Sequence, residues 1–353
     1  MRRVRRALVV SASVALGLAG VWKLVQHASE RGAGTFGESP APAPRGGDFP
    51  REVRLPSGEL AVVHSRPVRI VPASATAVDL VAALVSPERV AALPVQALEY
   101  SGVERRLEGF AHAPRFEAYL AERLLALEPD LVVVDPWQSA DTSAVLARAG
   151  LAVIELPVIQ DLSGALVAIE LVARALGEER RGADLIAELE RRVAALRASA
   201  GRRRGLRALS YSNFGAAGWT AGSATTVHEV LTLAGLTDAA AEAGREGHVE
   251  ISFEELLALD PDLILVSRPL QMVAGPAGDR GGASEALLRS EASLASLRAV
   301  REDRIVALPA WLYATGSHEL VSAAEVLAGE VDRLLARIDA RSQARSRSGG
   351  GEQ

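Results

Sequence analysis

The stretch ERLLALEPDLVVV, from Glu122 to Val134, recurs as EELLALDPDLILV from Glu254 to Val266 with nine of thirteen positions identical. A second pair, SATAVDLVAAL from Ser74 and SATTVHEVLTL from Ser223, agrees at six of eleven positions and comes in the same order. The shared order indicates duplication of a whole α/β lobe and not of one helix. The predicted fold class is therefore α/β, with two similar lobes and a ligand cleft between the lobes.

Short apolar runs alternate with helical patterns in both copies, which is typical of parallel strands joined by crossover helices. The predicted strands are Arg69–Val71, Val90–Leu93, Leu131–Val134, Val153–Leu156, Leu206–Tyr211, Leu263–Val266 and Ile305–Leu308. A hairpin is expected within Phe49–Val63, which carries the turn residues Pro56-Ser57-Gly58, and a last helix is expected over about Ser317–Ala340.

Two helical patterns, Leu162–Leu176 and about Glu178–Ala200, lie between the copies on either side of Gly177. The second runs for about 23 residues, which at about 1.5 Å per residue makes a rod of roughly 35 Å. We expect a long α-helix that joins the two α/β lobes and limits their opening to small bending motions.

The chain begins with four arginines and an apolar run from Ala7 to Trp22, a pattern that predicts export. The run is either a cleaved signal peptide or an uncleaved membrane anchor. We expect the signal or anchor in 1–30, a flexible linker in 31–48, the N-terminal lobe in 49–161, the helical connector in 162–200, the C-terminal lobe in 201–340 and a disordered tail in 341–353. The predicted location is periplasmic, either soluble or anchored to the inner membrane.

Composition excludes several classes of function. A net charge of -5 gives no basic field for nucleic acid, and the absence of cysteine removes disulfides, thiol catalysis and a lipoprotein thiol. Neither a GxSxG elbow nor a GxGxxG loop occurs, and the histidines lack HExxH spacing. We therefore expect a monomer that is not an enzyme and has no cofactor and no metal site.

Aromatic residues are scarce, at 4%, but several follow predicted strands, as Trp137, Trp219 and Trp311 do. The carboxyl ends of parallel strands are where open α/β sheets bind ligands. The predicted ligand-binding residues are Ser74, Thr76, Tyr100, Arg115, Trp137, Tyr211, Phe214, Trp219, Arg268, Trp311 and Tyr313. Each has a structural alternative: the aromatics pack against loops, the hydroxyl residues only cap helices, and the arginines are solvated.

The first copy is about 17 residues longer than the second between the two repeated segments, because 48 positions separate Ser74 from Glu122 and 31 separate Ser223 from Glu254. This insertion contains Tyr100, Arg115 and further aromatic and arginine residues. Its composition favours a binding loop over a packing element.

Glu122 and Glu254 occupy the same position in the two copies, at the start of the helix before a core strand. The helix dipole alone would favour a carboxylate there. Two symmetry-related carboxylates also suggest docking points for a partner that has two-fold symmetry.

Four stretches together resemble the substrate-binding proteins of ABC importers of the siderophore and cobalamin type. They are RIVPASATAVDLVAAL from Arg69, the segment from Glu122, TAGSATTVHEVLTLAG from Thr220 and HVEISFEELLALDPDLILV from His248. The resemblance implies two Rossmann-like lobes bridged by a helix, a ligand in a shallow cleft, and a glutamate of each lobe, here Glu122 and Glu254, that meets arginines of the membrane permease. The implied ligand is rigid: a ferric siderophore, a corrinoid or a haem.

Other readings of the sequence stay open. The same fold could bind a metal or an oxyanion, or the protein could be a sensor that has lost its transporter. A two-lobed enzyme such as a nucleotide-sugar transferase is the rival from another class, and it would need a nucleophile or base with a partner that the sequence does not reveal.

Overall fold

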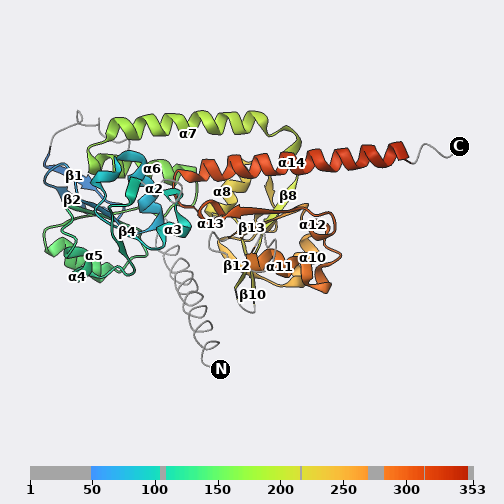
Figure 1. Ribbon diagram of the computed structural model, residues 1–353, viewed down its shortest axis with the longest axis horizontal. Helices are drawn as coiled ribbons and strands as arrows, with labels where there is room; N and C mark the ends of the chain where they lie inside the picture. The colour runs from blue at the N-terminus through green and yellow to red at the C-terminus, as the bar shows by residue number, and fades with distance from the viewer. Residues whose placement is uncertain (1–48, 104–108, 215–216, 269–281, 314, 349–353) are drawn as a thin grey trace, which may run out of the picture. The chain divides into compact units, whose positions relative to one another are not determined.

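The structure is a computed structural model of the chain, and it describes residues 49–348 apart from 104–108, 215–216, 269–281 and 314 (Figure 1). Internal contacts divide the chain into two units. Unit 1 contains the described residues through Ile159 together with Ser163–Leu185 and Phe214, whereas unit 2 contains Gln160–Leu162, Ile186–Asn213 and the described residues from Ala217 onward. The α/β fold predicted from the duplicated segments is confirmed, because each unit has its own parallel sheet.

The sheet of unit 1 has three parallel strands in the order β3 (Ile70–Pro72), β6 (Leu131–Val134) and β7 (Ala152–Glu155). All four residues of β6 are buried, as expected for the central strand of a sheet covered on both faces. The helices of unit 1 are α2 (Ala75–Leu84), η1 (Pro87–Arg89), α3 (Ala97–Tyr100), α4 (Ala121–Leu125), α5 (Ala140–Arg148) and α6 (Leu162–Leu176).

Two small strand pairs flank this sheet. The predicted hairpin is confirmed, since β1 (Arg51–Arg54) pairs antiparallel with β2 (Leu60–Val63). The predicted strand Val90–Leu93 is wrong as a single element. Val90 makes only an isolated bridge to Ile70, and the chain then turns so that β4 (Leu93–Pro94) pairs with β5 (Arg115–Phe116). The apolar run is buried, but Pro94 has no N–H with which to extend a ladder.

Unit 2 contains a four-stranded parallel sheet in the order β11 (Thr237–Asp238), β8 (Arg207–Ser210), β13 (Leu263–Arg268) and β14 (Ile305–Pro309). A second sheet has the order β12 (His248–Ile251), β10 (Ala217–Ala221) and β9 (Ser212–Phe214). The helices of unit 2 are η3 (Gly201–Arg203), α8 (Thr226–Leu233), α9 (Ala239–Glu242), α10 (Phe253–Leu259), α11 (Gly282–Ser290), η4 (Ala292–Leu294), α12 (Arg298–Arg301), α13 (Ala310–Tyr313) and α14 (Glu319–Ser348).

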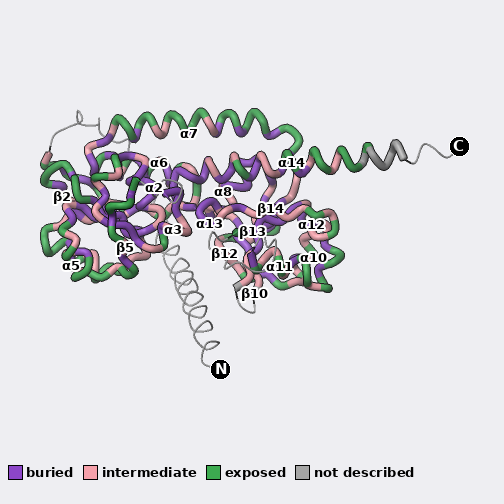
Figure 2. The backbone as a smooth tube through the Cα atoms, in the orientation of Figure 1, coloured by how far each residue is buried: buried purple, intermediate pink, exposed green. Residues whose placement is uncertain are grey.

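The long connecting helix predicted after Gly177 is confirmed as α7 (Glu179–Ser199), whose 21 residues span about 31 Å. Its first part belongs to unit 1 and its second part to unit 2. In unit 1, Gly182 lets α7 approach α6, because a Cβ at this position would lie 2.6 Å from the Ala173 Cβ. In unit 2, the Arg192 guanidinium binds Glu325 on α14 through two contacts of 2.9 and 2.7 Å. Figure 2 shows many exposed residues along α7 between these attachments.

The last helix is longer than the sequence predicted. Its apolar pattern suggested an end near Ala340, but α14 continues to Ser348, so the first part of the expected disordered tail is helical. Among the residues of α14 whose burial the structure describes, Leu334 is the last buried one. Beyond it, Asp339 forms a 2.7 Å ion pair with Arg202 of η3.

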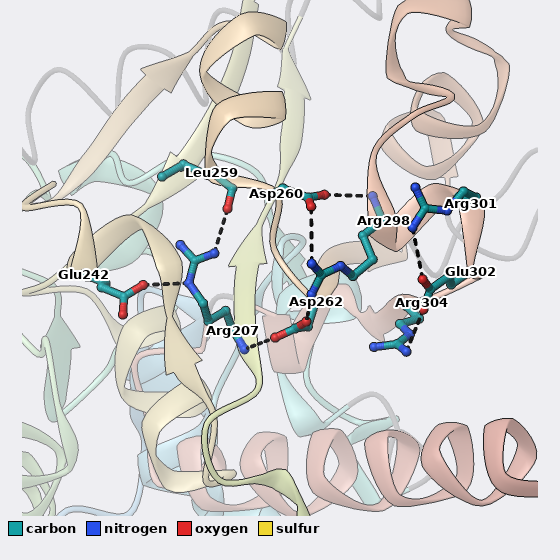
Figure 3. Close-up of polar contacts among 9 residues, drawn as sticks. All are labelled: Arg207, Glu242, Leu259, Asp260, Asp262, Arg298, Arg301, Glu302 and Arg304. Atoms are coloured by element: carbon teal, nitrogen blue, oxygen red, sulfur yellow. Dashed lines mark hydrogen bonds and ion pairs between the residues drawn. The ribbon is translucent and has the colours of Figure 1, made fainter.

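Each unit contains, at the amino ends of its strands, its own copy of the same set of hydrogen bonds, which we call the clamp. In unit 2, Arg207 donates from Nη1 to the Leu259 carbonyl at 2.7 Å, and its own N–H donates to Asp262 Oδ2 at 2.9 Å (Figure 3). In unit 1, Arg69 donates to the Leu127 carbonyl at 2.6 Å, and its N–H donates to Asp130 Oδ2 at 3.0 Å.

The backbone between the clamped groups is also the same in both units. Glu128 and Asp260, which occupy equivalent positions in the repeated segment, both have positive φ, at 49° and 35°. Each ends the preceding helical turn in a conformation that L-residues rarely adopt. The duplicated sequence thus encodes one duplicated corner between a helix and a strand.

We expect Asp262→Ala to lower the free energy of unfolding of unit 2 by about 1–3 kcal/mol, because the Arg207 N–H and the Arg298 guanidinium, 2.6 Å from Asp262, both lose their acceptor. Denaturant unfolding and hydrogen exchange of β8 amides would measure the loss. The control is Asp184→Ala, since Asp184 is exposed on α7. Equal stability of the two variants would show that the clamp does not support the fold.

Candidate functional site

Ser74 and Asp135 lie side by side at the carboxyl edge of the unit 1 sheet. The β3–β6 register pairs Pro72 with Val133, so the residues two positions further on are neighbours. Ser74 caps α2 by accepting the Ala77 N–H at 3.0 Å, which confirms its predicted role as an N-cap. Asp135 was not among the predicted ligand-binding residues, although it directly follows β6, whose four residues are all buried.

Trp137 completes this group. Its indole Nε1–H donates to Asp135 Oδ2 at 3.2 Å, and the side chain is half-buried. Gln138 ties the same turn to the other strand end by donating to the Ala73 carbonyl at 3.1 Å. The turn after β6 therefore holds an indole beside a carboxyl group at the middle of the sheet edge.

Burial raises the pKa of Asp135 from 3.8 to about 6, and hydrogen bonds from Ser74 and Trp137 oppose the shift. The residue is 8% exposed, and no Lys, Arg or His of the described chain forms an ion pair with it. At neutral pH the site thus holds a buried, predominantly ionised carboxylate without a cationic partner.

Tyr100 belongs to the insertion and is the last residue of α3. Tyr100 is half-buried, and burial followed by the charge of Glu99 raises its pKa. The next two residues are fixed on α2, because the buried carboxylate of Asp79 accepts the Ser101 hydroxyl at 2.5 Å and the Gly102 N–H at 2.8 Å. The backbone directly after Tyr100 is therefore held by hydrogen bonds to α2.

Two other predicted residues of unit 1 have ordinary local roles. Thr76 is half-buried in the first turn of α2, two residues after the cap. Arg115, in β5, donates from Nη1 to the Ala113 carbonyl of its own loop. Phe110 and Phe116 of the insertion are buried and serve packing, whereas Arg105 and Arg106 lie outside the described residues.

In unit 2, Tyr313 lies near the end of β8. Its hydroxyl is 3.1 Å from Ser212 Oγ, burial raises its pKa, and hydrogen bonds with Ser212 and Ser210 oppose the shift. Ser210 Oγ also accepts the Ala221 N–H of β10 at 2.9 Å. Phenol and hydroxyl groups thus gather where the two sheets of unit 2 meet.

The remaining predicted residues of unit 2 differ in exposure. Trp219 of β10 is half-buried, and Arg268 is exposed at the last position of β13. Tyr211 is completely buried in the core, where Gly218 leaves room for its ring, and Trp311 is 6% exposed. We therefore interpret Tyr211 as a packing residue. Phe214 ends β9, but its side chain lies outside the described residues.

A hydroxyl residue also caps α8 in unit 2. It is Thr225, which accepts the His228 N–H at 3.1 Å. The His228 ring in turn lies 2.9 Å from the buried carboxylate of Asp238 through Nδ1. This histidine–aspartate pair was not foreseen, because ten residues separate its members and no motif joins them.

Glu122 and Glu254 are both exposed in the first turn of their helices, α4 and α10. The neighbouring Glu255, and not Glu254, forms the capping box of α10 with Ser252. Glu254 is thus not needed to cap its helix.

Two further findings concern the described residues, 49–348 with their gaps. No helix in them is both long and apolar enough to cross a membrane. No group of three or more histidine, aspartate or glutamate residues in them could hold a metal ion.

A chain with two α/β units, each built on a parallel sheet and joined by one helix, has the organisation of a two-lobed binding protein. Residues 67–312 match the periplasmic binding protein family, and the chain belongs to that family. Comparison with curated proteins gave no significant match.

Solved structures agree with this assignment. The periplasmic heme-binding protein RhuT from Roseiflexus sp. RS-1 is 27% identical, with a TM-score of 0.63 over 74% of this chain and 96% of RhuT. An ABC-type Fe3+-hydroxamate transport protein from Saccharomonospora viridis is 22% identical, with a TM-score of 0.61 over 79% and 97% of the two chains. The molybdate-binding protein MolA from Haemophilus influenzae is 16% identical, with a TM-score of 0.65 over 82% and 94%. The last two similarities show the fold alone.

We expect Asp135→Asn to raise the free energy of unfolding at pH 7, because the amide has no charge to bury. The folded carboxyl, with its pKa raised from 3.8 to about 6, keeps its proton where the unfolded chain has lost it. The cost of the wild-type carboxylate therefore develops as pH rises from about 4 to about 6 and is absent below that range. We expect the free energy of unfolding of the variant to exceed that of wild type by about 1–3 kcal/mol more at pH 7 than at pH 4. Denaturant unfolding at the two pH values measures this difference.

Asp184→Asn is the matched control, because Asp184 is exposed and its substitution should give the same small difference at both pH values. His248, whose pKa burial lowers to about 4, is present in all the proteins, so its own pH dependence cancels in the comparison. A pH-independent difference between Asp135→Asn and wild type would contradict the burial of a charged Asp135.

Proposed function

We propose that this protein is an extracytoplasmic solute-binding protein that captures a rigid ligand, such as a ferric siderophore, a corrinoid or a haem, and delivers it to an ABC-type permease. The observation that carries the proposal is the set of polar and aromatic side chains at the carboxyl edge of the unit 1 sheet, in a chain of the periplasmic binding protein family. The named ligands of RhuT and of the Saccharomonospora viridis protein support an iron-containing ligand.

The ligand-contacting residues that we propose lie near the carboxyl ends of strands, and all of them except the buried Ser74 are half-buried or exposed. In unit 1 they are Trp137, Tyr100, Ser74, Thr76 and Arg115; in unit 2 they are Trp219, Tyr313 and Arg268. Indole and phenol rings offer broad apolar faces with a polar tip, which suits a large planar or compact ligand. A preorganised site and a rigid ligand both lose little conformational entropy on binding.

Capture without chemistry agrees with the side chains present. A histidine paired with an aspartate could serve as a base, and His228–Asp238 is such a pair. The only hydrogen bond of the His228 ring among the described residues is to Asp238, however, so no nucleophile is aligned with it. The family consists of transport binding proteins, which favours binding over catalysis.

We further propose that the protein is exported and works as a monomer at the outer face of the inner membrane. The arginine-rich start and the apolar run after it support export. Binding of molybdate by MolA keeps an oxyanion as the second candidate ligand, although at 16% identity MolA supports that ligand only weakly.

Purification of the protein from its native periplasm, followed by native mass spectrometry and an absorbance scan, tests the ligand class. We expect a bound mass with an iron-siderophore, corrinoid or haem absorption band. Recovery of molybdate or another small oxyanion would replace this ligand class with the alternative, and turnover of a nucleotide-sugar would contradict the binding role.

We expect the double charge reversal Glu122→Arg with Glu254→Arg to abolish uptake of that ligand into cells and to leave its Kd within about twofold of wild type. Both carboxylates are exposed and equivalent in the two units, so reversal repels a basic permease surface without touching the proposed ligand contacts.

The control reverses two exposed acids of α7, Asp184→Arg with Glu190→Arg, and should leave uptake unchanged. A large loss of ligand affinity in the purified Glu122/Glu254 variant would count against a docking role. Equal loss of uptake in both double variants would point to a general effect of net charge.

A further inference from the structure

Asp135 combines three features that structural roles do not explain. It stands at the carboxyl end of β6, the middle strand of the unit 1 sheet, where ligands of open α/β sheets bind. It is 8% exposed, and no cation of the described chain pairs with it. A buried, unpaired carboxylate destabilises a fold, so its presence at a sheet edge suggests a role outside the fold.

Its bonding capacity is only partly used. A carboxylate can accept about four hydrogen bonds. Ser74 and the Trp137 indole supply two donors, and both come from elements at the same sheet edge. The site therefore has acceptor capacity that a donor group of a bound molecule could use, next to the N–H edge of a half-buried indole.

The described neighbours of Asp135 are uncharged, so the site disfavours an anionic group of a ligand. Its pKa reflects burial and the two hydrogen bonds, neither of which comes from a titrating group, and no described charge contributes. A ligand carboxylate would meet an acceptor of the same charge. An ammonium group would instead gain a charge-assisted hydrogen bond.

We propose that Asp135 is a specificity-determining residue that accepts a hydrogen bond from an ammonium or amide group of the ligand. The inference rests on the proposed function and narrows its ligand class. A siderophore that carries a free ammonium group, or a corrinoid with its carboxamide side chains, satisfies the site. A haem propionate directed at the same edge does not.

The test measures the Kd of the full chain for four probes: ferrioxamine B, which has a free ammonium group, its N-acetyl derivative, cyanocobalamin and haemin. Wild type, Asp135→Asn and the control Asp184→Asn are compared by tryptophan fluorescence quenching at pH 7.5 and pH 5. The expected result is that wild type binds ferrioxamine B or cyanocobalamin, and that Asp135→Asn weakens that binding by about tenfold or more.

The paired siderophores isolate the charge. If ferrioxamine B is the bound probe, acetylation should weaken its binding to wild type and have little effect in Asp135→Asn. Binding of the ammonium or amide probe to wild type should also weaken at pH 5, where Asp135 is protonated, and this pH dependence should be absent in the variant. A purely structural role for Asp135 would not produce this coupling between the residue and the probe's amine.

Each other outcome has a definite meaning. Binding of the same probe by wild type and Asp135→Asn within twofold would overturn this inference and leave the proposed function intact, as would wild-type binding of haemin alone. Failure of wild type to bind any of the four probes would contradict the proposed function itself.

Discussion

The fold of each unit depends on the clamp at the amino ends of its strands. An arginine that begins the first strand holds the carbonyl of the preceding helical corner, and an aspartate of that corner holds the arginine's backbone N–H. These contacts fix the register between the first strand and the central strand of each sheet. The register in turn places Ser74 beside Asp135 at the opposite edge, about 15 Å away along the sheet. The geometry of the proposed site thus depends on contacts at the opposite end of the sheet.

Much of the fold could be predicted because the sequence contains it twice. The repeated segment around Leu127 and Leu259 predicted a helix followed by a buried strand, and both copies form them. The uninterrupted helical pattern after Gly177 likewise predicted α7. The prediction of a strand at Val90–Leu93 was wrong because an apolar sequence indicates that a segment is buried, but not that it pairs with another strand. The end of α14 was missed because the sequence from Arg341 to Ser348 contains no large apolar residue whose spacing would give a periodic signal.

The candidate site was harder to predict, since residue type and proximity to a strand end do not determine which way a side chain points. Tyr211 and Tyr313 both follow core strands, yet the first is enclosed by the core and the second reaches Ser212 at the sheet edge. Asp135 was missed for a different reason. A single aspartate after a strand belongs to no sequence motif. Its environment depends on the strand register, which brings Ser74 next to it, and on the turn after β6, which brings the Trp137 indole N–H to its carboxylate.

The separation between the two edges of each sheet has a consequence for how such a protein can change. Within this one chain, the repeated segments agree at most positions around the clamp, whereas the segments leading to the opposite edge differ in length by about 17 residues. The clamp at the amino edge and the recognition residues at the carboxyl edge are far apart, so mutations at one edge have nearly independent effects on stability from those at the other. Mutations at the carboxyl edge can therefore change selectivity while the fold is kept. An engineer could therefore transplant new recognition loops onto this scaffold, provided the arginine–aspartate corners are retained.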